Sequence, residues 1–103
     1  MRIELLYFDG CPSYAELLPR LRELVAGEGI DEEVKLRRVE TPDEAACERF
    51  LGSPTVRIDG EDVDPTGKDR SDYGLECRLY RTDGGLERMP PEEWIRAALR
   101  RAA

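Results

Sequence analysis

Residues 3–8, Ile-Glu-Leu-Leu-Tyr-Phe, constrain the fold more than any other part of the sequence. Apolar side chains at consecutive positions point to both faces of a strand, which is typical of a central strand covered by helices on two sides. Asp9-Gly10 then turns the chain, and Pro12 suits the first position of a helix. Apolar residues recur at helical spacing from Tyr14 to Val25 before two glycines end the pattern. A buried strand followed by a long amphipathic helix predicts an α/β fold.

Two patterns predict the elements that come next. Residues 34–39 alternate apolar and charged side chains, which indicates a second, exposed strand at a sheet edge. Residues 41–44, Thr-Pro-Asp-Glu, form a capping-box pattern with proline at the first helical position. We therefore expect a short helix that carries Ala45, Ala46 and Phe50 and ends at Gly52.

The Asp59-Gly60 pair predicts a hairpin. This dipeptide is typical of a type I′ turn, so residues 55–58 and 61–64 are expected to form two antiparallel strands around it. Residues 65–75 are rich in Gly, Asp and Pro and indicate a surface loop of the kind that often carries function.

The segment Cys77 to Arg81 alternates like a strand, and its place in the sheet is open. If it is an extra strand outside the core sheet, the loop before it can bring Cys77 to the end of the sheet where Cys11 lies. If it is itself the fourth core strand, Cys77 lies at the opposite end. Asp83-Gly84-Gly85 then turns the chain, and Pro90-Pro91 starts a final helix. The inward face of this helix carries Trp94, Ile95, Ala98 and Leu99.

Together these elements predict one domain spanning residues 1–103 with the order βαβαββα. Right-handed crossovers and the buried first strand favour a mixed sheet with strand order 2-1-3-4. A further strand or hairpin is expected before the last helix.

Composition excludes several classes of function. The net charge of −7 disfavours nucleic acid and anionic membranes as partners. No signal peptide or apolar run of about 20 residues is seen, so we expect a cytoplasmic protein. The chain has no histidine, which removes the commonest general base and the usual nitrogen ligand of zinc. Three cysteines are an odd number, so at least one free thiol is expected. The sequence also lacks a Cys-x-x-Cys motif, so neither a zinc site nor a resident cofactor is expected.

Cys11 is the candidate for chemistry. It lies at the carboxyl end of a central strand and at the start of a helix, where free backbone N–H groups and the helix dipole stabilise a thiolate. The third strand runs antiparallel to the first, so Pro54 and Thr55 are expected beside Cys11, and a cis proline would fit that turn. Asp9 either raises the pKa of this thiol, relays protons or caps the turn.

Gly10-Cys11-Pro12-Ser13 at a strand–helix junction and, much later, Gly52-Ser53-Pro54-Thr55-Val56 resemble the thioredoxin-like superfamily, glutaredoxins in particular. The resemblance covers residues 1–64. It implies that Cys11 is the nucleophile and that Pro54 is cis. Tyr14 stands where those proteins have the second cysteine of Cys-x-x-Cys. The resemblance therefore implies a monothiol type of redox protein, in which glutathione or Cys77 resolves the mixed disulfide.

In this hypothesis the partners are protein or small-molecule thiols and disulfides. The residues expected to bind substrate around the thiol are Pro12, Ser13, Tyr14, Ser53, Pro54 and Thr55. Tyr14 is either a core residue or a hydrogen-bond donor to the thiolate.

Two other hypotheses stay open. Residues 72–80 are similar to small bacterial proteins labelled alkylmercury lyase-like, which implies soft-metal handling by Cys11 and Cys77 with Asp69 or Asp72. Alternatively, the chain is a thioredoxin-like binding module without activity. Cys47, inside the predicted second helix, is expected to serve packing.

Overall fold

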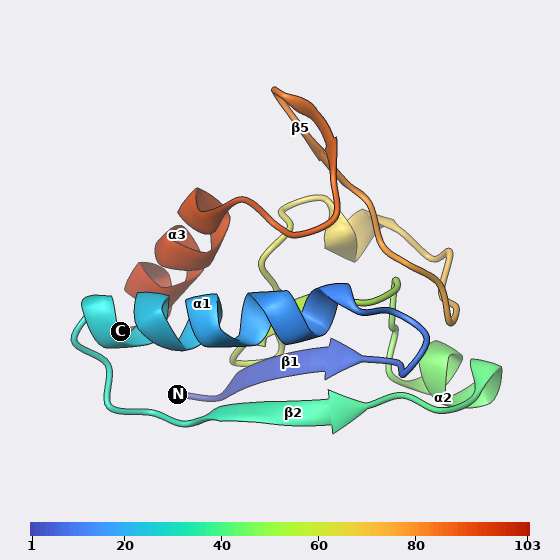
Figure 1. Cartoon of the computed structure of the whole chain (residues 1–103), viewed down its shortest axis with the longest axis horizontal. Coiled ribbons are helices and arrows are strands. Elements are labelled where there is room, and N and C mark those ends of the chain that lie inside the picture. Colours follow the sequence, from blue (N-terminus) through green and yellow to red (C-terminus); the bar gives the residue numbers. More distant parts are fainter.

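A four-stranded mixed sheet lies at the centre of the computed structural model, which describes all 103 residues (Figure 1). Across the sheet the strands are β2 (Val34–Arg38), β1 (Ile3–Tyr7), β3 (Thr55–Ile58) and β4 (Glu61–Asp62). β1 pairs parallel with β2 and antiparallel with β3, which pairs antiparallel with β4. The predicted order 2-1-3-4 is confirmed, and β2 lies at an edge as expected.

Two helices cover one face of this sheet. These are α1 (Ser13–Gly27) and α3 (Glu92–Ala102), which pack on each other and on the side chains of β1 and β3 that point toward them (Figure 1). α1 begins one residue later than predicted, directly after Pro12. The main core contains Ile3, Leu5, Leu17, Leu21, Leu24, Val25, Val56, Ile58, Ile95, Ala98 and Leu99, while Trp94 is half-buried against it.

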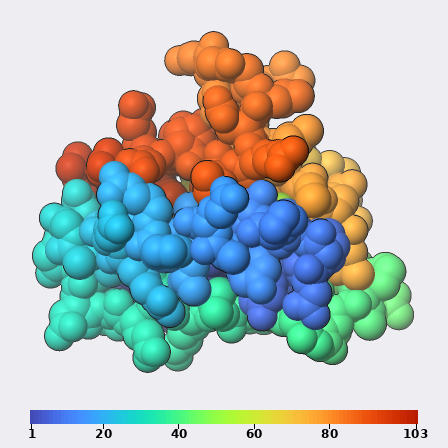
Figure 2. All heavy atoms as spheres, viewed as in Figure 1, coloured from blue at the N-terminus to red at the C-terminus, as the bar shows by residue number.

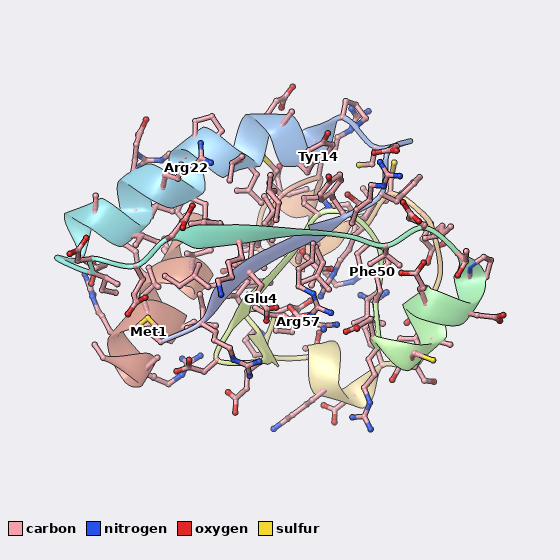
Figure 3. The ribbon with its side chains drawn as sticks, turned by 90° about the horizontal axis from the view of Figure 1, so that it is seen from below. Met1, Glu4, Tyr14, Arg22, Phe50 and Arg57 are labelled. Atoms are coloured by element: carbon pink, nitrogen blue, oxygen red, sulfur yellow. The ribbon has the colours of Figure 1, made fainter.

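The other face of the sheet is more polar than the sequence predicts. A small cluster of Leu6, Val39, Ala45 and Phe50 is buried there. Beside it, Glu4 is buried and accepts a 3.0 Å hydrogen bond from Arg37. In Figure 3, Glu4 and Arg57 lie on the side of the sheet away from α1, which carries the labelled Tyr14. The short helix on this side covers only one end, so ion pairs complete the face.

That short helix, α2 (Pro42–Cys47), ends earlier than predicted. Its start is as expected, because the Thr41 hydroxyl accepts a 3.1 Å hydrogen bond from the Glu44 N–H. Arg49 has a left-handed backbone with a φ of 55°, and the Phe50 N–H reaches back 2.8 Å to the Ala45 carbonyl. These are the features of a Schellman motif. The prediction of a helix up to Gly52 is therefore wrong.

The last third of the chain leaves the sheet and returns to it. A 3₁₀ turn, η1 (Gly67–Asp69), lies in the predicted loop, and a hairpin of β5 (Tyr80–Thr82) and β6 (Gly85–Glu87) follows. Figures 1 and 2 show this hairpin projecting from the body of the molecule. The hairpin expected before the last helix is confirmed, but the strand predicted at Cys77 begins only at Tyr80. No helix has the length and apolar character needed to cross a membrane.

Candidate functional site

Cys11 lies at the carboxyl end of β1, in the turn that leads into α1. Its backbone N–H donates to the Phe8 carbonyl at 3.2 Å, which closes the turn. The residue is only 1% exposed, and its sulfur donates to the Ser53 carbonyl at 3.3 Å. Ser13, the first residue of the helix, is buried beside it, whereas Pro12 is exposed. The predicted position at a strand end and a helix start is confirmed.

The Ser53-Pro54 peptide bond is cis, as expected, and Ser53, Pro54 and Thr55 are all buried. The Thr55 hydroxyl donates to the Gly52 carbonyl at 2.6 Å, and the Tyr80 hydroxyl donates to the Pro54 carbonyl. A side chain at the start of β3 and one from the later strand β5 thus fix the loop that faces Cys11.

Cys77 lies beside this loop. It pairs with Ser53 in an isolated parallel bridge: the Ser53 N–H donates to the Glu76 carbonyl and the Arg78 N–H donates to the Ser53 carbonyl, both at 2.9 Å. Because β4 is the fourth core strand, the first of the two placements left open by the sequence is the correct one. The Ser53 backbone, expected to bind substrate, is occupied by this segment of the same chain.

Gly52 allows the two segments to approach. Its φ is +120°, and a Cβ built there would lie 2.8 Å from the Glu76 carbonyl oxygen and 3.0 Å from the Arg78 Cβ. Such contacts are too short for any side chain, so only glycine permits this spacing. The Glu76–Arg78 segment therefore depends on Gly52 for its position.

The buried side chain of Arg78 anchors the Glu76–Arg78 segment on its interior side. Its fully buried guanidinium contacts Asp62 at 2.7 Å, Asp64 at 3.3 Å and the Thr55 hydroxyl at 3.0 Å. The guanidinium carbon also lies 4.4 Å from the centre of the Tyr80 ring. Two carboxylates balance the buried cation, as a buried charge requires. Next to it, Cys77 and Leu79 are exposed, so these two side chains do not face the core.

The two thiols have opposite pKa shifts. Burial raises the pKa of Cys11, but hydrogen bonds from the Ser13 backbone, the Cys77 thiol and the Ser53 and Ser13 hydroxyls outweigh it, so the net shift is downward. The pKa of Cys77 is raised, first because its thiol donates to Cys11, and then by burial and by the negative charge of Cys11, against a smaller opposing effect of Arg88. The first proton lost from this pair therefore leaves Cys11.

The Ser53 hydroxyl adds to this stabilisation. Its oxygen is buried and has no hydrogen-bond partner. Since the hydroxyl lowers the Cys11 pKa, it becomes a donor when the sulfur is ionised. An unpartnered buried hydroxyl costs free energy that the thiolate recovers.

Tyr14, Asp9 and Cys47, which were also considered from the sequence, have other surroundings. Tyr14 is half-buried, packs against the core and stacks on Tyr7 with ring centres 4.0 Å apart. The Asp9 carboxylate contacts Arg38 at 3.1 Å. Cys47 is exposed, so the expectation that it serves packing is wrong.

No third ligand joins the two thiols. Asp72 accepts two hydrogen bonds from Arg70, at 3.0 and 2.6 Å, and Asp69 is exposed in η1. No group of three or more Cys, Asp or Glu side chains is placed to hold a metal ion. The aspartate that a mercury lyase-like site would add to Cys11 and Cys77 is thus not assembled with them.

No family model, curated protein or solved structure matches the chain. The function is therefore argued from the geometry of the site. Sequence reasoning missed Gly52 and Arg78 as parts of this site. For Arg78 the signal was present in Asp62 and Asp64, two carboxylates on one short segment that need a cation if they are buried.

Proposed function

We propose that the protein exchanges disulfides through the thiol pair Cys11 and Cys77, on a thioredoxin-like scaffold. The observation that carries this proposal is the bridge between Ser53 and Cys77, on the same loop whose carbonyl accepts the hydrogen bond from the Cys11 sulfur. Tyr14 leaves no second thiol within α1, and Cys77 supplies one from a distant part of the chain. The proposal thus replaces the monothiol hypothesis by a dithiol one.

The reaction converts one disulfide into another. A partner R–S–S–R and the two protein thiols give a Cys11–Cys77 disulfide and two R–SH molecules, so the partner is reduced by two electrons and the protein is oxidised by two. The thiolate is the reactive form in each exchange, and the lowered pKa of Cys11 favours that form at Cys11. Partners are protein or small-molecule disulfides, with glutathione as a co-substrate, and the expected compartment is the cytoplasm.

The first test is the location of the disulfide. The full chain is held in a glutathione redox buffer, its free thiols are alkylated, and peptides are assigned by mass spectrometry. We expect a Cys11–Cys77 disulfide in the wild type and in Cys47→Ser, and no internal disulfide in Cys77→Ser. A disulfide that uses Cys47, or none at all, contradicts the proposal.

Activity provides the second test. Reduction of a small disulfide substrate is expected to fall to background in the double variant Cys11→Ser/Cys77→Ser and to stay at the wild-type rate in Cys47→Ser. Full reductase activity in the double variant would exclude thiol chemistry at this site. A Cys11 of ordinary pKa that forms no disulfide with Cys77 would leave the binding-module hypothesis.

Soft-metal binding is the second candidate function. Two adjacent thiols with no third ligand suit an ion such as Hg(II), which accepts two thiolates. Isothermal titration of the reduced protein with Hg(II) is expected to show one tight site that is lost in Cys77→Ser. Binding that is unchanged in this variant contradicts the candidate.

A further inference from the structure

We propose that exchange partners bond to the sulfur of Cys77, and that Cys11 reacts only with the sulfur of Cys77. This assignment rests on the proposed function and gives the two thiols an order. Cys77 is the outer sulfur, which carries the mixed disulfide. Cys11 is the inner sulfur, which resolves that mixed disulfide in one direction and leaves as a thiolate in the other.

Exposure supports this order. Cys11 is 1% exposed, whereas Cys77 is exposed. A thiolate has to reach the sulfur that it attacks, so access decides which of two sulfurs reacts. With the Glu76–Arg78 segment in place, a partner reaches Cys77 directly and Cys11 only after this segment has moved.

The segment that carries Cys77 is firmly held. Its two backbone hydrogen bonds to Ser53 are both 2.9 Å long, and the buried Arg78 ties it to Asp62 and Asp64. The close approach of Gly52 adds a packed contact beneath it. Moving the segment breaks these contacts together, so it stays closed during exchange at Cys77.

The environment of Cys11 fits the role of the leaving sulfur. It sits at the start of α1, where the helix dipole favours negative charge, and the unpartnered Ser53 hydroxyl is buried beside it. A thiol of lower pKa leaves faster from a disulfide, and the pKa of Cys11 is lowered while that of Cys77 is raised. Attack on Cys77 therefore expels the better leaving group.

The steps balance as follows. A partner thiolate R–S⁻ attacks the Cys77 sulfur of the protein disulfide, the S–S bond breaks, and its electron pair goes to Cys11. A second R–S⁻ attacks the partner sulfur of R–S–S–Cys77, which releases R–S–S–R and leaves Cys77 as a thiolate that takes a proton from water. Two thiols are oxidised to one disulfide, and the protein disulfide is reduced to two thiols. In the opposite direction the Cys77 thiolate attacks R–S–S–R and releases one R–S⁻, and the Cys11 thiolate then attacks the Cys77 sulfur of R–S–S–Cys77, which forms the protein disulfide and releases the second R–S⁻.

The test locates the mixed disulfide. Cys47→Ser protein is equilibrated in buffers that contain reduced and oxidised glutathione, quenched with acid and alkylated, and the glutathione adducts are assigned by mass spectrometry. We expect the adduct on Cys77 to exceed the adduct on Cys11 by about tenfold or more, because only the outer sulfur has room for it. A dominant adduct on Cys11 overturns the proposal.

Single-thiol proteins give a second readout. With Cys47→Ser present throughout, Cys11→Ser leaves only Cys77 and Cys77→Ser leaves only Cys11. Oxidised glutathione is expected to modify the lone Cys77 about tenfold faster or more than the lone Cys11, despite the lower pKa of Cys11. Equal rates, or a faster Cys11, overturn the order. Absence of a Cys11–Cys77 disulfide in the same buffers overturns the proposed function instead, and the single-thiol rates still decide which sulfur partners reach.

Discussion

Replacing Arg78 by leucine should both destabilise the protein and uncover Cys11. The substitution keeps an apolar stem but leaves Asp62 and Asp64 without their cation, and these carboxylates have side chains only 15% and 6% exposed. Removing one partner of a buried ion pair costs about 3–5 kcal/mol. Because Asp62 retains some contact with solvent, we expect a loss of about 3 kcal/mol, the lower end of that range.

The same loss predicts a change in reactivity. If most of the loss of about 3 kcal/mol destabilises the closed position of the Glu76–Arg78 segment relative to an open one, the open population rises on the order of 100-fold, since about 1.4 kcal/mol is a factor of ten. Alkylation of Cys11, measured in a Cys77→Ser background, should then accelerate by a similar factor.

Urea unfolding and alkylation kinetics measure the two effects, and Arg70→Leu is the matched control. Arg70 pairs with Asp72 in the same loop, but their side chains are 33% and 58% exposed. Such a pair contributes about 0–1 kcal/mol, and its removal should leave Cys11 covered. If Arg78→Leu were as stable as Arg70→Leu and Cys11 reacted no faster, the anchoring role of Arg78 would be refuted.

Four further predictions concern backbone conformation and ionisation. Gly52→Ala should lower the urea unfolding free energy by about 2 kcal/mol or more, because it combines a positive φ with a 2.8 Å contact to backbone, and an unchanged midpoint would contradict this. Arg49→Gly should raise that free energy by about 1 kcal/mol, since Arg49 is left-handed at a φ of 55°. Gly29→Ala should lower it by about 1 kcal/mol, since Gly29 has a φ of 73° and open space around it; changes of the opposite sign would refute the strain argument. The free energy of unfolding is measured against pH for the wild type and for the double variant Cys11→Ser/Cys77→Ser. The difference between them should rise with pH from the lowered pKa of Cys11 to the ordinary cysteine value, because in this range the native state binds fewer protons than the unfolded state. Stability should then fall toward the raised pKa of Cys77, and a flat profile would show that the thiols are not coupled.

Local patterns predicted the sheet and the position of Cys11 correctly. Consecutive apolar residues in β1 required cover on two faces, and Asp59-Gly60 adopts positive φ at both residues, as a type I′ turn requires. The start of α2 was equally local, because Thr41 and Glu44 form the cap within one turn. Each of these features depends on residues that are close in sequence, so the sequence suffices to predict it.

The end of α2 could not be predicted in the same way. Glycine is the usual residue at a left-handed helix end, and Gly52 was the first one available. The helix instead ends through Arg49, because burying Phe50 against Ala45 repays the strain of a left-handed arginine. A tertiary contact thus overrides the local preference.

Sequence alone also fails to predict which side chains of the Cys77 segment point into the core. Alternation alone makes Cys77 and Leu79 the inward pair, because they are the less polar of the two possible sets. The structure buries Arg78 and Tyr80 instead, since Asp62 and Asp64 neutralise the guanidinium and the Pro54 carbonyl accepts the tyrosine hydroxyl. Burial of a charge with its counter-charges therefore turns the neighbouring thiol outward.

This reversal determines what the thiol pair can do. Had Cys77 pointed into the core, it would be a small buried residue without access to partners. With Arg78 buried, Cys77 is exposed while its backbone remains hydrogen-bonded to Ser53, whose carbonyl also accepts from the Cys11 sulfur. Tyr14 in place of a second cysteine and the buried Arg78 are thus related features of the site. The second thiol comes from a distant segment, and the arginine beside it holds that segment over the first.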